Sequence, residues 1–273
     1  MTERATLNGR TIVISGGSRG IGLAIALRAA ADGANLVLLA KTDQPHPRLE
    51  GTVHTAVEQI EAAGGRGLAV VGDVRNDDDI ARTVAAAVDT FGGIDIVVNN
   101  ASVLAPMGTL ELPPSRYDLM QDVNVRGTFM LTRACLPQLL AAVDPRVLTL
   151  SPPLNLSPHW LGQFPGYTLA KYGMTLATLG FAAEFPQVAA STLWPRTLIA
   201  TAAIGNTLGQ AALARTRSPR IVADAAHLIL TSPPRSGQTL IDDEVLAEAG
   251  ITDLSGYAHL PGATDLQADI FLD

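Results

Sequence analysis

Short apolar runs alternate with longer segments of helical periodicity along most of the chain. The short runs are almost continuously apolar, which is typical of parallel strands buried on both faces. The segments between them are long enough for crossover helices. The alternation therefore predicts an α/β domain with a parallel sheet. Its seven predicted strands are residues 11–15, 35–40, 67–71, 94–99, 146–151, 188–194 and 238–242.

Three segments lack clear periodicity, namely residues 41–51, 152–165 and 243–273. The first two follow predicted strands, and open α/β sheets bind ligands at the carboxyl ends of their strands. We therefore expect these two segments to border a ligand site. We predict a single dinucleotide-binding and catalytic domain, residues 1–243, followed by a C-terminal extension, residues 244–273.

Composition and charge exclude several classes of protein. The chain has 273 residues, is 47% hydrophobic and carries a formal charge of −7. This hydrophobic share excludes a disordered chain, and Arg28 and Asp32 interrupt the richest apolar stretch before it reaches the roughly 18 residues of a membrane span. The acidic balance, without a cluster of basic residues, argues against nucleic acid or a membrane as partner.

The single cysteine, Cys135, cannot form an internal disulfide, and no apolar signal sequence precedes the first strand. We therefore expect an intracellular, cytoplasmic protein. The five histidines lack the spacing of metal ligands, so we predict no metal site.

A glycine-rich turn, S-G-G-S-R-G-I-G at residues 15–22, joins the first predicted strand to a predicted helix at residues 23–31. Glycine at 16 permits a tight turn, glycine at 20 lets the backbone approach a pyrophosphate, and glycine at 22 lets helix and strand pack closely. The helix N-terminus offers unpaired N–H groups. The spacing differs from G-x-G-x-x-G, and a plain turn is the alternative reading. We predict a dinucleotide site that includes Ser15, Gly16, Ser18, Arg19, Gly20 and Ile21.

The end of the second predicted strand bears on the choice of cofactor. NAD enzymes commonly place an acid there and NADP enzymes a base. Here Lys41 stands at that place, Arg19 adds a second cation, and the nearest acid, Asp43, lies beyond the strand. We therefore favour NADP over NAD. Two alternatives stay open: Asp43 could bend back toward the ribose, or both cations could be solvated surface charges.

Tyr167 and Lys171 are four residues apart in a predicted helix at residues 167–183, which places both on one face. An ammonium neighbour favours the phenolate, so we expect the pKa of Tyr167 to fall toward the neutral range where acid–base catalysis is effective. A core tyrosine beside a snorkelling lysine is the alternative. Asn124 lies inside a predicted helix at residues 115–140, where asparagine has poor propensity, which indicates either packing or a function.

These motifs resemble the short-chain dehydrogenase/reductase family in order and spacing, together with N-N-A-S at 99–102, N-V-R-G-T at 124–128 and Y-x-x-x-K at 167–171. The resemblance reaches to about Asp243. The hydroxysteroid dehydrogenase-like subgroup is similar in four further segments, at residues 41–47, 148–155, 194–197 and 241–246. We expect no added sterol-carrier domain, which some eukaryotic members have, and infer no sterol substrate from the subgroup's name.

The resemblance implies a Rossmann-type, doubly wound sheet with helices on both faces, and an NAD(P)-dependent oxidoreductase that acts on a ketone or secondary alcohol. It also implies a homo-oligomer, often a tetramer, packed through the helices equivalent to 115–140 and 167–183. In the family, Tyr167 would transfer a proton with the substrate oxygen. Lys171 would shift the pKa of that tyrosine and bind the nicotinamide ribose, and Asn124 would order a water on the proton path.

Further positions match cofactor contacts of the family. Asn100 and Ala101 belong to the turn beside the ribose, in which Ser102 replaces the usual glycine. Asp73 corresponds to the acid near the adenine amino group, with a turn or cap aspartate as the alternative. The segment 195–201 matches the loop that contacts the carboxamide, through Pro195 and Thr197, although Arg196 replaces the usual glycine and Thr201 sits one place late.

The chain departs from the family at the serine that polarises the substrate carbonyl. Leu154 occupies the usual spacing, and alignment from the strand places Ser151 at the first serine of the pair and Pro152 at the second. Because proline cannot donate a hydrogen bond, the contact must come from Ser151, Asn155 or Ser157, or be absent. We predict Ser151, with a strand-end hydroxyl that satisfies the turn as the alternative. This departure motivates a rival function, a catalytically weak dinucleotide-binding sensor or scaffold.

Four rings lie near the predicted catalytic helix: His159, Trp160, Phe164 and Tyr172. We interpret them as packing residues, and an apolar pocket is the alternative.

Overall fold

The computed structural model describes residues 6–45 and 51–272, so the end of the segment 41–47 lies outside the described residues. All seven predicted strands are present, each within two residues of its predicted bounds. They form one parallel sheet in the order β3-β2-β1-β4-β5-β6-β7. The strands are β1 Thr11–Ser15, β2 Asn35–Ala40, β3 Arg66–Val71, β4 Ile96–Asn99, β5 Arg146–Thr149, β6 Ala189–Trp194 and β7 Thr239–Ile241.

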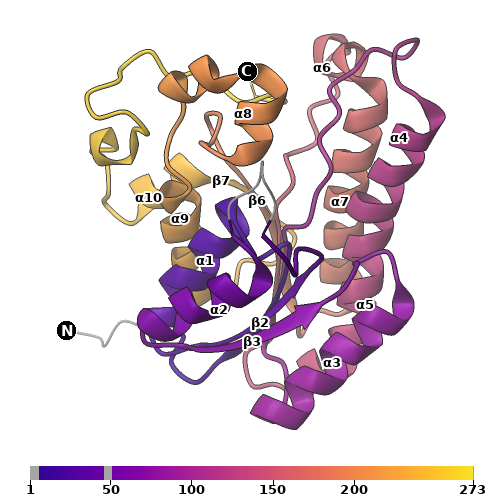
Figure 1. Cartoon of the computed structure of the whole chain (residues 1–273), viewed down its shortest axis with the longest axis vertical. Helices are drawn as coiled ribbons and strands as arrows, with labels where there is room; N and C mark the ends of the chain where they lie inside the picture. The colour runs from indigo at the N-terminus through magenta and orange to yellow at the C-terminus, as the bar shows by residue number, and fades with distance from the viewer. Residues whose placement is uncertain (1–5, 46–50, 273) are drawn as a thin grey trace.

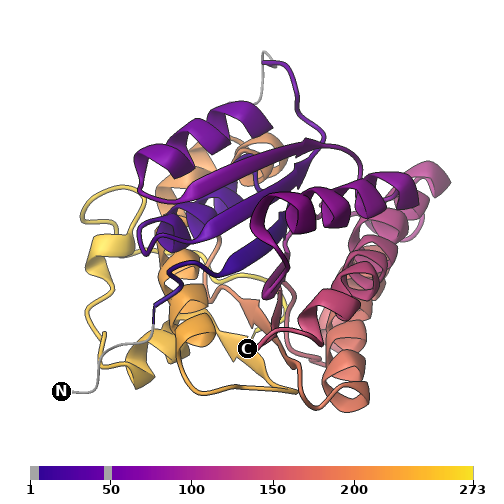
Figure 2. The ribbon, with the colours of Figure 1, turned by 90° about the horizontal axis from the view of Figure 1, so that it is seen from below.

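Helices cover both faces of this sheet (Figures 1 and 2). Helices α1, α2 and α9 pack together on one face, and α3, α5 and α7 on the other. The predicted doubly wound, Rossmann-type architecture is therefore confirmed. The helices are α1 Gly20–Ala30, α2 Val53–Ala62, α3 Asp77–Phe91, α4 Pro114–Met120, η1 Gln121–Arg126, α5 Gly127–Leu139, α6 Pro158–Gln163, α7 Pro165–Glu184, α8 Ala202–Leu208, η2 Gln210–Arg215, α9 Arg220–Thr231, α10 Asp242–Glu248 and η3 Ser255–Tyr257.

The core has two layers because successive side chains of a strand point to opposite faces. Ile12 and Ile14 of β1 pack in the layer beneath α1 and α9, whereas Val13 packs in the layer beneath α3 and α5. All three are fully buried. None of the helices that the structure describes is both long and apolar enough to cross a membrane.

The structure differs from the sequence prediction in three helical segments. The single helix expected at residues 115–140 is divided by η1, a π-helical segment that contains Asn124. Widened turns of this kind are frequent at functional sites. Helix α6 lies within residues 152–165, and α10 begins at Asp242, although both segments were expected to be irregular. Val245 and Leu246 of α10 pack in the core and α6 lies beside α7, contacts that local periodicity does not reveal.

Candidate functional site

The glycine-rich turn has a backbone that few other residues could adopt. Gly16 and Gly20 have φ angles of +69° and +57°, and a Cβ on Gly16 would lie 3.0 Å from the Cα of Ala101. Ser15 Oγ accepts hydrogen bonds of 3.1 Å from the backbone N–H groups of Asn100 and Ala101. The structure therefore brings the predicted phosphate loop and the turn after β4 into direct contact.

Asn100 fixes the shape of this loop. Its Nδ2 donates 3.0 Å hydrogen bonds to the carbonyl oxygens of both Ser15 and Gly16. Helix α1 then begins with four uncharged residues, 20–23, and its N-cap residue Arg19 donates from its guanidinium to the carbonyl of Gly51, at 2.7 Å. Because no acid neutralises this first turn, the positive end of the α1 dipole is available to an anion.

Lys41 and Asp73 meet beyond the ends of β2 and β3. The Lys41 side chain is 61% exposed, and its Nζ lies 3.1 Å from Asp73 Oδ2. Arg75 donates to the same carboxylate at 2.6 and 2.9 Å. Burial raises the pKa of Asp73, but the contacts with Arg75 and Lys41 outweigh it and hold that pKa well below its usual range. Asp43 instead lies 2.7 Å from His54 Nε2 of α2.

Helix α7 presents Tyr167 and Lys171 on one face, and they are only 4% and 3% exposed. Lys171 Nζ donates a 3.0 Å hydrogen bond to the carbonyl of Leu150, next to β5. It also lies 5.2 Å from the ring centroid of Trp194. Burial lowers the pKa of Lys171 to about 8, although the charge of Asp269 opposes this shift.

Tyr167 has an environment that the sequence did not predict. Its ring stacks on Phe271, with centroids 6.2 Å apart and planes 22° apart. Burial, and then the charge of Asp269, raise the pKa of Tyr167 well above its usual value. The expected shift of this pKa was downward, so that expectation is wrong. The phenol is held protonated, which suits a proton donor.

Asn124 uses both ends of its amide on one residue. Val103 N–H donates to Asn124 Oδ1 at 2.7 Å, and Asn124 Nδ2 donates to the Val103 carbonyl at 3.1 Å. The side chain is fully buried in η1. It therefore holds the segment after β4 against the π-helical turn, and the predicted role in ordering a water stays a prediction.

Ser151 is fully buried, and its hydroxyl oxygen lies 2.9 Å from that of Thr175. Thr175 also donates to the carbonyl of Pro152, at 2.6 Å. Residue 175 is two helical turns, about 12 Å, along α7 from residue 167. The structure therefore pairs the Ser151 hydroxyl within the helix–sheet interface, with Thr175 rather than with Tyr167.

The two other candidate donors lie in the turn before α6. Asn155 donates its backbone N–H to the hydroxyl of Tyr172 at 3.1 Å, and its Nδ2 donates to the Phe271 carbonyl at 3.4 Å. The Ser157 N–H donates to Asn155 Oδ1. The Ser157 hydroxyl is buried and has no hydrogen-bond partner among the described residues.

Sequence reasoning missed the C-terminal residues of the site. We name residues 267–272 the C-terminal strap. Figure 1 shows this yellow end of the chain returning to the region of α8. The strap forms an antiparallel bridge from Ala268 to Thr197, and Phe271 packs among the rings near Tyr167. The available signal was an apolar triplet, residues 270–272, in an otherwise mixed tail.

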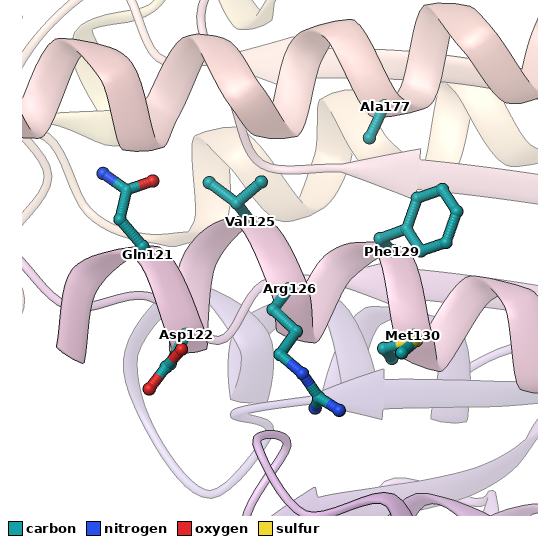
Figure 3. A pocket seen from close by; sticks show the side chains of 7 residues that line it. All are labelled: Gln121, Asp122, Val125, Arg126, Phe129, Met130 and Ala177. Carbon is teal, nitrogen blue, oxygen red and sulfur yellow. The ribbon is translucent and has the colours of Figure 1, made fainter. Parts of the chain in front are cut away.

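A groove outside this site lies between the η1–α5 segment and α7 (Figure 3). It has a volume of about 350 Å³, with Val125, Phe129 and Ala177 among its apolar walls and Asp122 and Arg126 at its polar side. Its lining includes none of the predicted site residues. The groove is therefore separate from the dinucleotide and catalytic positions.

Comparison with known proteins identifies the family to which this chain is similar. The family model described as short chain dehydrogenase matches residues 10–202. Hydroxysteroid dehydrogenase-like protein 2 of Rattus norvegicus is 50% identical over 98% of this chain, and the chain spans 51% of that relative's length. A candidate dehydrogenase from Xanthomonas campestris superposes with a TM-score of 0.95 at 58% identity, covering 98% of this chain and 99% of that one. A short chain dehydrogenase from Mycobacterium thermoresistibile has a TM-score of 0.93 at 50% identity, covering 98% and 96%.

Proposed function

The chain belongs to the short-chain dehydrogenase family, and on that premise we propose that it is an NADP-dependent oxidoreductase acting on a ketone or secondary alcohol. The observation that carries the proposal is the buried Tyr167–Lys171 pair on α7, at the carboxyl edge of the same sheet as the glycine-rich turn. The first test is a titration with NADPH and NADH, followed by NADPH consumption with a panel of carbonyl compounds.

The residues present fit a dinucleotide. Residues of the glycine-rich turn would hold the pyrophosphate, where a Cβ on Gly16 would meet Ala101 and the α1 N-terminus carries no acid. Asp73 would lie toward the adenine, Asn100, Ala101 and Lys171 toward the ribose, and Pro195 and Thr197 toward the carboxamide. The Thr197 hydroxyl is buried without a hydrogen-bond partner among the described residues, as expected of a group that awaits a ligand. A bound NADP supplies or accepts the hydride.

The protein's own residues handle the proton. In ketone reduction Tyr167 donates its phenolic proton to the carbonyl oxygen, which becomes the alcohol, and the phenolate remains. The positive charge of Lys171 stabilises that phenolate. Asn124 acts indirectly, because its two hydrogen bonds to Val103 position the segment that follows β4.

NADP preference would depend on Lys41. We expect Lys41→Ala to weaken NADPH binding about tenfold or more and to leave NADH binding within about twofold, because hydrogen bonds to charged groups contribute about 1.5–3 kcal/mol. Asp43 is held by His54, which supports a base rather than an acid at this place. Fluorescence titration of both cofactors measures the change.

The matched control is Arg235→Ala, which removes a cation from a distant ion pair with Glu248. It should leave both affinities unchanged. A wild-type preference for NADH, or equal losses for NADPH and NADH in Lys41→Ala, would refute the assignment of NADP.

Ser151 provides a second test. Removing an oxyanion donor lowers kcat by about 10²- to 10³-fold. Because the Ser151 hydroxyl is paired with Thr175, we expect Ser151→Ala to lower kcat by less than about tenfold and to lower the melting temperature by about 2–4 °C, as for the loss of one buried hydrogen bond. Thr175→Val, the matched control, should lower the melting temperature at least as much, because it also removes the hydrogen bond to the Pro152 carbonyl. A loss of kcat above a hundredfold would restore Ser151 as the carbonyl donor.

The rival proposal, a dinucleotide-binding sensor or scaffold with weak catalysis, draws on two observations. Phe271 covers the ring of Tyr167, and Ser151 is paired inside the helix–sheet interface. Tight NADPH binding without consumption of NADPH on any carbonyl would favour this rival.

We also propose a homo-oligomer, a tetramer, that packs through α5 and α7. Phe129 is 45% exposed, and Leu169 and Leu176 project from α7 with more than half of their surface exposed. The two leucines, seven residues apart, share a face of α7, and the adjacent Ala177 lines the groove of Figure 3 together with Phe129. Such an apolar stripe on paired helices is suited to self-association.

Phe129→Asp should therefore shift the mass measured by light scattering toward the monomer. Leu260→Asp, which changes an exposed leucine of the C-terminal extension, should not. A monomeric wild type would contradict the proposed assembly.

A further inference from the structure

The first half of the C-terminal strap is anchored to the loop after β6. Leu198 N–H donates to the Gln267 carbonyl at 2.9 Å, and Asp269 N–H donates to the Arg196 carbonyl at 3.0 Å. These bonds flank the antiparallel bridge from Ala268 to Thr197. The strap is therefore aligned with the very loop that would hold the carboxamide of the cofactor.

The second half places one ring in an aromatic cage. Phe271 is 2% exposed, and its ring centroid lies 5.1 Å from that of Tyr172 and 6.1–6.2 Å from those of Trp160, Tyr167 and Trp194. It stacks against the phenol that would donate the proton. Tyr167 is only 4% exposed in this arrangement. A substrate whose carbonyl reaches the phenol must therefore take space that this ring fills.

The backbone at Phe271 is held in an unfavourable conformation. Phe271 has a φ of +73°, the one positive φ at a non-glycine position among the described residues. This region is costly for a bulky residue. Asn155 Nδ2 donates to the Phe271 carbonyl over a long distance, 3.4 Å, and Trp194 Nε1 donates to the carbonyl of the neighbouring Ile270 at 3.1 Å. The ring is therefore kept in place mainly by apolar packing, which another ring of similar size could replace.

From these observations we propose that Phe271 occupies the substrate subsite as an internal plug, and that the substrates are ketones with a ring-sized apolar group that displaces it. Partly buried Leu104, Met107 and Leu154 extend the apolar wall. A flat or cyclic apolar group matches these walls, whereas a small or highly polar ketone would leave the cage unfilled. The inference rests on the proposed function and names its substrate class.

The plug predicts a direct competition. When the competent state is only partly populated, the apparent affinity of a ligand falls by that fraction, and removing the competing contact restores it. Phe271→Gly is the sharpest variant, because glycine accepts a φ of +73° and the strap can keep its path without the ring. Phe271→Ala removes the same ring and retains the strain. Both should behave alike if the ring itself is the plug.

The experiment measures the Kd of cyclohexyl methyl ketone and of butanone by calorimetry, for the full chain with NADP bound, in wild type, Phe271→Gly and Phe271→Ala. We expect the Kd of cyclohexyl methyl ketone to fall at least fivefold in both variants and that of butanone to change less than twofold. Leu260→Ala, on the same extension, should change neither value.

Tryptophan fluorescence reports on the plug without any ligand, since both tryptophans of the chain contact Phe271. The constant for acrylamide quenching should rise at least twofold in Phe271→Gly. If that constant is unchanged, if cyclohexyl methyl ketone binds no more tightly to the variants, or if it binds to none of the proteins, the plug is refuted. Tighter binding without turnover in any of these proteins would instead refute the oxidoreductase and retain the plug.

Discussion

The Tyr167→Phe variant is expected to bind NADPH as the wild type does and to lose turnover by about 10²- to 10⁴-fold, the usual contribution of a positioned acid–base group. The variant removes a single oxygen. The ring that stacks on Phe271 stays, so packing within α7 should be preserved. The hydroxyl makes no hydrogen bond to any residue that the structure describes, so its loss leaves no partner unsatisfied. The expected effect is therefore confined to the proton transfer.

Steady-state kinetics with the best ketone of the panel, together with NADPH titration, checks this result. Tyr257→Phe is a matched control because Tyr257 is also buried, while its hydroxyl donates to Asp224 of α9, away from the site. It should lower the free energy of unfolding by about 1.5–3 kcal/mol, as for a hydrogen bond to a charged group, and leave kcat unchanged. Turnover that survives in Tyr167→Phe would rule out this tyrosine as the proton donor.

Local pattern was sufficient for the sheet and for the phosphate loop. All six residues of β2 are buried, and residues 36–40 form a continuous apolar run that can be identified from the sequence. Gly16 and Gly20 have positive φ angles that favour glycine, so the turn can be predicted from the glycines in the sequence. Features of this kind depend on neighbours in sequence, and sequence analysis can recover them.

The remaining features of the site depend on contacts between distant segments. The upward shift of the Tyr167 pKa comes from burial and from Asp269, about a hundred residues later in the chain. The pairing of Ser151 depends on Thr175, which belongs to α7. The π-helical turn at Asn124 has the same apolar pattern as an ordinary helix, and its hydrogen bonds to Val103 become visible only in three dimensions. No window of local sequence contains these partners.

The charge of Lys171 should control the pH dependence of turnover. Burial lowers the pKa of Lys171 from 10.5 to about 8, so the ammonium is present below that pH and is lost above it. Ketone reduction leaves a phenolate on Tyr167, which the ammonium stabilises, so kcat should fall as the pH rises through about 8.

The lowered pKa of Lys171 also makes the stability of the fold depend on pH. The unfolded chain binds more protons than the folded one between about pH 8 and 10.5, and the free energy of unfolding therefore rises with pH in that window.

Lys171→Met should lower kcat at pH 7 by about 10- to 10³-fold, because a neighbouring opposite charge typically shifts the pKa of an ionisable group by about 1–3 units. Its pH profile should lack the decrease centred near pH 8, and its melting temperature at pH 7 should not fall by more than a few degrees, since the variant no longer buries the charge of Lys171. Asp269→Asn is the matched control. The charge of Asp269 raises the pKa of Lys171, so its removal should move the descending limb of the wild-type profile to lower pH. If the decrease in kcat near pH 8 occurs at the same pH in Asp269→Asn, or is still present in Lys171→Met, then a group other than Lys171 is responsible for it.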